Sequence, residues 1–270
     1  MSTLSTALAL QARQARSQKL SSATAPTTYR PKDIWTLIRE RSHLVEKLED
    51  PVHFRHWLWY LHRAVGGNHR AYFHAPPQHG KTSVTLWGLA WILLRHPGLS
   101  HAYMTFTAAR AKEMNLLFRL IATASGLTFT GDQRTLRFSN GSVLTFTSAD
   151  QGLTGKPITG VLIGDDFYRE QTDADSPTKR MRIELMWGNS VIGRLHRATS
   201  VLVLGTRWHP QDWYGKLVEE QGYQQVLLPA LAEENDPNGR AVGEALFPFR
   251  FTADELLAKK RDLMPSAWAS

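Results

Sequence analysis

The 270-residue sequence contains no cysteine. Disulfide bonds and cysteine-ligated zinc or iron–sulfur sites are therefore excluded, and this composition suits a reducing cytoplasm. Long apolar runs are also lacking, because the longest, Val84–Leu94, is too short to span a bilayer. The first residues contain no compact apolar segment with a cleavage site, so no secretory signal is predicted. These absences together predict a soluble protein with no membrane partner.

Acidic residues are scarce relative to basic ones. There are 24 Asp and Glu against 32 Lys and Arg, which gives a formal net charge of +8. Such a surplus suits a polyanionic partner, but a basic soluble enzyme would have it too, and charge alone does not choose between the two. Hydrophobic residues make up 42% of the chain, enough for a substantial core. Residues 1–32 are instead rich in Ser, Thr and Ala, and predict a flexible basic arm.

Strand and helix patterns alternate along the rest of the chain. Apolar segments predict strands at Arg70–His74, Ala102–Phe106, Leu136–Phe138, Val143–Thr147, Val161–Ile163, Val201–Leu204 and Gln224–Leu228. Helical patterns occur over residues 34–48, His53–Val65, Lys81–Arg95, Ala108–Ala122 and Thr252–Leu263. An Asn140-Gly141 turn predicts a hairpin between two of the strands. The pattern predicts an α/β fold with a mostly parallel sheet flanked by helices, and the hairpin as an edge insertion.

We divide the chain into three parts on this basis. The arm at residues 1–32 precedes a core at 33–230, and residues 231–270 form a small lid-like subdomain or linker. The boundary is placed at the polar, turn-rich segment Glu233–Gly239.

The segment Ala75–Thr82, of sequence APPQHGKT, lies between a predicted strand and an apolar helix, as a phosphate-binding loop must. Gly80 lets the backbone approach phosphates, and the helix N-terminus presents N–H groups to negative charge. Lys81 supplies a cation, and the Thr82 hydroxyl is suited to ligate Mg²⁺. The predicted nucleotide contacts are Pro77, Gln78, His79, Gly80, Lys81, Thr82 and Ser83. The general pattern begins with Gly where this chain has Ala75, and an ordinary strand-to-helix turn is the alternative interpretation.

Adjacent carboxylates, Asp165 and Asp166, follow the apolar segment Val161–Ile163. A nucleotide hydrolase needs one acid near Mg²⁺ and another to orient or deprotonate the attacking water. We assign Asp165 to the metal and Asp166 to the water; the alternative is that the pair ends a strand and caps a helix. A further strand between the loop and this pair favours the additional-strand type of P-loop NTPase. Thr206, after Val201–Leu204, is a candidate for the polar group that senses the terminal phosphate, or is simply a turn residue.

In combination, these segments resemble the ATPase domain of the large terminase subunit of tailed bacteriophages. The matching pieces occur in family order over roughly residues 50 to 270, at positions 76–82 (PPQHGKT), 152–156 (GLTGK), 163–166 (IGDD), 173–176 (DADS), 194–195 (RL) and 205–209 (GTRWH).

The resemblance implies a motor that hydrolyses ATP with Mg²⁺ and pumps double-stranded DNA into a procapsid. It implies that Lys81 and Thr82 bind phosphate and Mg²⁺, that Asp165 is the Walker B acid, and that Asp166 fills the catalytic-acid position. Gly205, Thr206 and Arg207 resemble a motif that couples hydrolysis to DNA movement. Where many relatives have Arg before His79, this chain has Gln78. The partners implied are the portal protein and the small terminase subunit, at the portal in the host bacterial cytoplasm.

A ring motor usually needs a cation from the neighbouring subunit at the transferring phosphoryl group. Lys156 and Arg194 are our candidates, although either could be a solvated surface charge. We expect a homo-oligomeric ring on the portal and a monomer in isolation. Relatives continue into a nuclease domain that should begin near Ser270, so no DNA cleavage is expected from this chain. Residues His53, Phe54 and Trp57 could stack on adenine, but core packing explains them better.

Two other functions fit part of the pattern. A helicase-like ATPase would remodel nucleic acid outside packaging and would separate strands. A non-catalytic basic DNA-binding or assembly module would bind DNA with a steep salt dependence and no response to nucleotide.

Overall fold

The computed structural model describes residues 32–46, 48–49, 52–153 and 157–262. The predicted arm up to residue 31, Lys156 and residues 263–270 therefore lie outside the described residues. The strands are β1 (Arg70–His74), β2 (Ser100–Thr105), β3 (Phe129–Gly131), β4 (Thr135–Phe138), β5 (Val143–Ser148), β6 (Val161–Asp165), β7 (Ser200–Leu204) and β8 (Gln224–Leu227). The α-helices are α2 (Ile34–Arg41), α3 (Arg55–Arg63), α4 (Lys81–Arg95), α5 (Ala108–Ala124), α6 (Gln171–Asp175), α7 (Pro177–Met186), α8 (Trp213–Glu219) and α9 (Ala253–Asp262). Short 3₁₀ turns are η1 (Ser42–Leu44), η2 (Val52–Phe54) and η4 (Ile192–Arg194), and η3 (Trp187–Val191) is a π turn.

The strands form one sheet in the order β3-β4-β5-β2-β6-β7-β1-β8. The pairs from β5 to β8 are parallel, whereas β3 and β4 are added antiparallel at one edge, as the Asn-Gly hairpin predicts. Strand β7 lies between β1, which precedes the phosphate loop, and β6, which ends in the aspartates. This inserted strand defines the additional-strand type of P-loop NTPase. The predicted fold class is confirmed.

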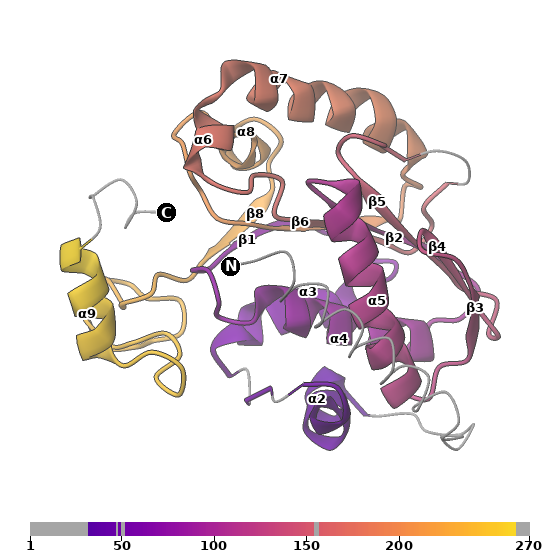
Figure 1. The fold of residues 1–270 in the computed structure, drawn as a ribbon, viewed down its shortest axis with the longest axis horizontal. Helices are drawn as coiled ribbons and strands as arrows, with labels where there is room; N and C mark the ends of the chain where they lie inside the picture. The colour runs from indigo at the N-terminus through magenta and orange to yellow at the C-terminus, as the bar shows by residue number, and fades with distance from the viewer. Residues whose placement is uncertain (1–31, 47, 50–51, 154–156, 263–270) are drawn as a thin grey trace.

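Helices cover both faces of the sheet (Figure 1). Helices α2 to α5 pack on one face, and α6 to α8 pack on the other. Alternation along β1 shows how one strand serves both layers, because Phe73 lies in the core with α3 and α4 while Tyr72 lies in the core with α8. Phe54 and Trp57 are fully buried against Phe73, so these two aromatic residues are core residues, as expected. No helix among the described residues is long and apolar enough to cross a membrane.

Most predicted boundaries differ from the structure by one or two residues, but some elements were not predicted. The helical pattern at 34–48 forms helix only to Arg41 and then a 3₁₀ turn. Strand β3 and the helices α6, α7 and α8 were missed. Helix α7 buries only Ile183 and Met186 and exposes Met181 and Leu185, so its sequence has no clear apolar face.

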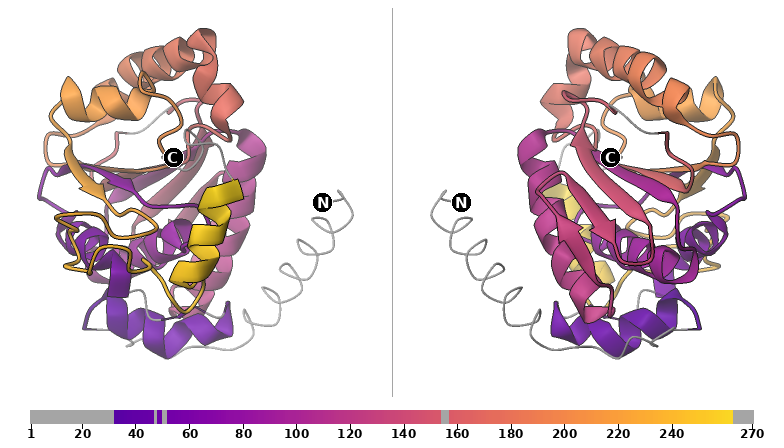
Figure 2. Two further views of the ribbon diagram at one scale, coloured as in Figure 1. Left: turned by 90° about the vertical axis from the view of Figure 1, so that its left-hand side faces the viewer. Right: turned by 90° about the vertical axis from the view of Figure 1, so that its right-hand side faces the viewer.

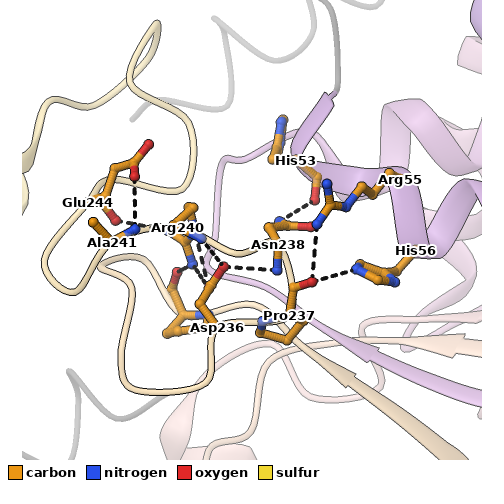
Figure 3. Close-up of polar contacts among 10 residues, drawn as sticks. His53, Arg55, His56, Asp236, Pro237, Asn238, Arg240, Ala241 and Glu244 are labelled. Atoms are coloured by element: carbon orange, nitrogen blue, oxygen red, sulfur yellow. Dashed lines mark hydrogen bonds and ion pairs between the residues drawn. The ribbon is translucent and has the colours of Figure 1, made fainter.

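Residues 231–262 lie to one side of the sheet and carry α9 (Figures 1 and 2). A loop in this segment is closed by an ion pair between Asp236 and Arg240, at 2.6 Å, which is almost completely buried. Figure 3 shows the tip of this loop against the start of α3. The carbonyl of Pro237 accepts hydrogen bonds from Arg55 (3.2 Å) and His56 (2.9 Å), and Asn238 Nδ2 donates to the His53 carbonyl (3.0 Å). The segment is thus fastened to the core; whether it acts as a separate lid stays a prediction.

Candidate functional site

The carboxyl ends of the parallel strands open into one cleft. The register aligns Asp165 at the end of β6 with Leu204 of β7 and Thr105 of β2, so the loops after these strands emerge at one edge of the sheet. The cleft has a volume of about 900 Å³. Its lining includes Pro77, Gln78, His79, Gly80, Lys81, Thr82, Ser83, Asp166 and Thr206. The structure therefore brings together the predicted phosphate loop, one of the two aspartates and the predicted polar strand tip.

The phosphate loop adopts backbone conformations suited to presenting N–H groups. Gly80 caps α4 in the left-handed region (φ 90°), and Gln78 also has a positive φ (64°). A Cβ at Gly80 would meet only Leu48, at 3.9 Å, so conformation and not space requires glycine there. Lys81 Nζ folds back onto its own loop and donates to the carbonyls of Ala75 (2.5 Å) and Pro76 (3.0 Å).

The loop and β6 meet through one hydrogen bond. Thr82 Oγ1 donates to Asp165 Oδ2 at 2.9 Å, and the Tyr103 hydroxyl from β2 donates to the same oxygen. Asp165 is only 2% exposed, and its Oδ1 has no hydrogen-bond partner among the described residues. A buried carboxylate oxygen without a partner is costly. The carboxylate that binds the Thr82 hydroxyl through Oδ2 thus keeps Oδ1 for a further partner.

Burial dominates the electrostatics of the pair. Burial and then the neighbouring Asp166 raise the pKa of Asp165 to about 7. Burial also raises the pKa of Asp166, and Lys81 and Arg110 oppose that shift. The pKa of Lys81 is lowered, again mainly by burial, with both aspartates acting in the other direction. Burial therefore disfavours the charged forms of Asp165, Asp166 and Lys81. A multiply charged anion that binds together with its own cation would relieve this cost.

A divalent cation fits this arrangement. Among the described residues, no group of three or more His, Asp or Glu could hold a metal alone. A hydroxyl and one carboxylate are instead the small set of oxygen ligands with which Mg²⁺ binds alongside phosphates and water. The unpartnered Asp165 Oδ1 is the oxygen that such an ion would satisfy.

Asp166 sits in an unusual backbone position. Its φ is +48°, while its N–H still bonds to Leu204 O (3.0 Å) in β7. The next N–H, of Phe167, donates to the buried hydroxyl of Tyr214 (2.7 Å). This turn directs the chain out of the sheet immediately after the acid pair. Asp and Asn tolerate the left-handed region better than most residues, which explains an acid at this point of the turn.

The predicted coupling segment is packed against the same tyrosine. A Cβ at Gly205 would lie 2.3 Å from the Tyr214 hydroxyl oxygen, so only glycine fits. Thr206 lines the cleft, whereas Arg207 turns away and pairs with the fully buried Asp212 at 2.8 Å. Asp212 also accepts from Trp208 N (3.1 Å) and Gly215 N (3.1 Å) and so shapes the loop that leads into α8. Of these two residues, only Thr206 lines the cleft, and Arg207 holds the loop through Asp212.

Two histidines, His53 and His79, connect the predicted phosphate loop to the C-terminal segment. His53 Nε2 donates to the His79 carbonyl (3.1 Å), and the His53 ring stacks on Phe247 (4.2 Å between centroids). Burial lowers the pKa of both histidines to about 4, so both are neutral at pH 7. His53 thus lines the cleft instead of lying wholly in the core. Ser83 also lines the cleft, but its hydroxyl donates to Glu46 (3.0 Å).

Of the two cations predicted to act from a neighbouring subunit, only Arg194 belongs to the described residues, and it does not line this cleft. Arg194 is exposed, and its carbonyl accepts from Ile158 N (2.8 Å) just before β6, at the opposite edge of the sheet. Lys156 lies outside the described residues. Cleft residues that sequence reasoning missed are Glu46, Leu48, Glu49, Val84, Arg110, Tyr168, Arg169, Trp208, Phe247, Phe249, Arg250 and Phe251. Arg169 could have been predicted, because it lies close to the acid pair in the sequence. Arg110 comes near the acid pair only because β2 pairs with β6.

No protein-family model matches the sequence, and no curated protein matches it either. Solved structures do match. The large terminase of HK97 bacteriophage superposes with a TM-score of 0.54 at 16% identity, over 88% of this chain and 52% of that protein. The large terminase ATPase domain of Thermus phage P74-26 superposes with a TM-score of 0.51 at 16% identity, over 89% of this chain and 97% of that domain.

This is the fold of a phage large terminase ATPase domain. A mutant of the Thermus phage domain gives the same result, with a TM-score of 0.50 over 96% of its length. The chain spans about half of the HK97 terminase and nearly all of the Thermus phage ATPase domain. The match thus extends over most of this chain.

Proposed function

We propose that the chain is the ATP-hydrolysing motor domain of a phage large terminase, which drives double-stranded viral DNA into a procapsid. The observation that carries the proposal is the hydrogen bond between Thr82 and Asp165, with Lys81 and Asp166 in the same cleft. A phosphate loop held against one buried carboxylate, with a second acid in the cleft, suits nucleotide hydrolysis. The likeness in fold to terminase ATPase domains supports the assignment to packaging.

Each residue has a defined role in this proposal. The N–H groups of the loop and Lys81 hold the terminal phosphates, which requires the Lys81 amine to leave the carbonyls of Ala75 and Pro76. Asp166 accepts a proton from the water that attacks the terminal phosphorus, as the bond to ADP breaks. Burial makes Asp166 a stronger base than an exposed aspartate. Mg²⁺, bound with the nucleotide, would be held by Thr82 and Asp165 and would neutralise phosphate charge.

In this proposal, the same contacts also couple ATP hydrolysis to DNA movement. Thr206 faces the cleft while its neighbour Gly205 is packed on Tyr214, whose hydroxyl binds the N–H that follows Asp166. A change at the terminal phosphate would therefore reach α8 through a short set of contacts. The proposed partners are duplex DNA, a portal protein, a small terminase subunit and further copies of the chain in a ring at the portal.

The test is ATP turnover, measured by phosphate release, together with binding of a non-hydrolysable ATP analogue. We expect Lys81→Ala to lose both, and Asp166→Asn to bind the analogue but lose turnover. Asp175→Asn, which changes an exposed acid on α6, is the matched control and keeps both. Turnover in Lys81→Ala equal to that of the parent would contradict the site.

The two alternative functions predict different responses to DNA. A packaging motor hydrolyses ATP faster when duplex DNA is added and does not separate the strands. Strand separation by the chain would support a helicase-like ATPase instead. DNA binding that weakens steeply with salt, without any ATP turnover, would support a non-catalytic module.

A further inference from the structure

Four cationic side chains of the described residues line the cleft: Lys81, Arg110, Arg169 and Arg250. Hydrolysis of a phosphoanhydride needs positive charge on the transferring phosphoryl group. The proposed function already assigns Lys81 to the terminal phosphates. Of the three arginines, Arg250 lies on the C-terminal segment, with its guanidinium 5.7 Å from the centre of the Phe251 ring, and the other two differ in the ion pairs that hold them.

Two of the four are tied to protein groups by several contacts. Lys81 donates to two carbonyls of its own loop. Arg169 makes a bidentate pair with Asp173, at 2.7 and 3.0 Å, and Asp173 is also bound by Lys179. The hydrogen bonds from Arg169, with one from Lys179, hold the pKa of Asp173 well below its usual range. Arg169 therefore serves to fix the turn after the acid pair.

Arg110 stands in a different setting. It lies in the first turn of α5, where its backbone N–H donates to the capping side chain of Thr107 (3.2 Å). Helix α5 follows β2 directly, and β2 is the strand whose Thr105 is in register with Asp165 and whose Tyr103 binds that carboxylate. Arg110 is thus anchored at the strand edge that carries both aspartates, and it counteracts the raised pKa of each.

The acidic partner of Arg110 is on its own helix. Arg110 Nη1 and Glu113 Oε2 are 2.9 Å apart, three residues along α5, and both side chains are 32% exposed. Pairs of this kind are weak because solvent screens them. A phosphate oxygen offers a guanidinium a stronger, charge-assisted bond. Glu113 can therefore hold Arg110 at the cleft without preventing its transfer to a ligand.

We propose that Arg110 is a catalytic cation supplied by the same chain, and that its guanidinium moves from Glu113 to the terminal phosphate of the bound nucleotide. The inference rests on the proposed ATPase function and deepens it. As water attacks phosphorus and its proton passes to Asp166, Arg110 compensates the charge on the oxygens of the transferring group. Arg110 acts in its own site, unlike Lys156 and Arg194, which are candidates for action in a neighbouring one.

Single variants test the role. We expect Arg110→Ala to lower kcat by at least about 100-fold while KM changes only a few-fold, and Arg110→Lys to recover part of kcat. Lys112→Ala, which removes an exposed cation from the same helix, keeps parental kinetics. Glu113→Gln keeps kcat and lowers KM, because the competing carboxylate is gone. Equal loss of kcat in Arg110→Ala and Glu113→Gln would show that the pair only supports the helix.

A mixing experiment tests action within the same chain. Arg110→Ala and Asp166→Asn are combined in equal amounts under conditions where the parent hydrolyses ATP. Action in the same chain predicts no turnover above the sum of the two variants. Restored turnover would overturn the proposal, because an intact Arg110 would then be serving the intact Asp166 of another copy.

The controls separate this inference from the function on which it rests. A parent without Lys81-dependent ATP hydrolysis contradicts the proposed function itself. A parent that hydrolyses ATP, with Arg110→Ala as fast as Lys112→Ala, contradicts only the role of Arg110. Thermal unfolding and analogue binding, measured on each variant, identify any loss of fold, and Arg110→Lys then provides the kinetic comparison.

Discussion

Thr82 and Asp165 are 83 positions apart in the chain, yet their side chains are joined by a 2.9 Å hydrogen bond. Thr82 lies in the first turn of helix α4, and Asp165 ends strand β6, with β7 and β1 completing the sheet between that strand and the loop. The bond therefore depends on the order of the strands as much as on the two residues. It places a hydroxyl beside a buried carboxylate, one oxygen of which has no partner in the part of the chain that the structure describes.

Thr82→Ala removes this hydroxyl. We expect ATP turnover to fall by about 10- to 100-fold, as for loss of one hydrogen bond to a charged group, and a higher Mg²⁺ concentration to be needed for half-maximal turnover. The physical reason is that Asp165 loses one donor and the cation loses one ligand. The measurement is a Mg²⁺ titration of phosphate release.

Ser83→Ala is the matched control for that titration. It removes the next hydroxyl along the helix, which donates to Glu46 and not to Asp165. Its Mg²⁺ dependence should equal that of the parent. Equal shifts in the two variants would mean that the Thr82 bond does not define the cation site.

Gly205→Ala tests the packing between the predicted coupling segment and α8. The new methyl carbon would lie 2.3 Å from the Tyr214 hydroxyl oxygen and 2.4 Å from its ring. Both groups are buried, so the overpacking should lower the free energy of unfolding by about 1–3 kcal/mol. Urea unfolding measures this, and ATP turnover should fall with it because Tyr214 also holds the turn after Asp166.

Gly193→Ala provides the comparison, since no atom lies within 4 Å of its Cβ position. Its unfolding midpoint should stay at the parental value. A Gly205→Ala protein as stable and as active as Gly193→Ala would show that the contact with Tyr214 is not required.

Sequence reasoning was most accurate where local signals and tertiary structure agree. The bounds of β1 and α4 match the prediction, because Pro76, Pro77 and Gly80 interrupt two apolar segments with residues of restricted or special conformation. The mostly parallel sheet followed from strands separated by helices, whereas the order of its strands was not predicted. The hairpin followed from Asn140-Gly141, where Gly141 has a positive φ.

Other features have no local signal. Helix α7 exposes Met181 and Leu185, so hydrophobic periodicity does not reveal it. Arg110 lies 55 residues before Asp165 in the numbering of the chain, and only the pairing of β2 with β6 brings them to the same cleft. Tyr103 and Tyr214 were likewise missed, because a tyrosine in an apolar segment does not indicate which buried group its hydroxyl will meet.

The buried histidines predict a loss of stability in acid. Burial lowers the pKa of His101 to about 4, from an ordinary value of 6.5, and the same holds for His53 and His79. As pH falls below 6.5, the unfolded chain binds protons that the folded chain does not. Each such histidine therefore lowers the free energy of unfolding by up to about 1.4 kcal/mol per pH unit, until the pH reaches about 4.

His101→Asn isolates one of these contributions. His101 is fully buried away from the cleft, and its Nδ1 accepts a hydrogen bond from Val161 N (3.1 Å), which an asparagine oxygen can replace. Urea unfolding at pH 7.5, 6.5 and 5.5 should show a smaller loss of stability for this variant than for the parent. An unchanged dependence on pH would contradict a neutral, buried His101.

The Asp236–Arg240 pair predicts how the C-terminal segment is held. The side chain of Asp236 is fully buried and that of Arg240 nearly so, although both residues lie in a partly exposed loop, and removing one partner leaves the other charge poorly solvated. Asp236→Ala should therefore release the loop that contacts α3 (Figure 3), and amide hydrogen exchange should rise over residues 231–262. The double variant Asp236→Ala/Arg240→Met removes both charges and should exchange less than the single variant.

Because Phe247 from this segment stacks on His53, which holds the phosphate loop at His79, ATP-analogue binding should weaken in the order of the exchange rates. Faster exchange without weaker binding would show that the segment is fastened to α3 for stability alone.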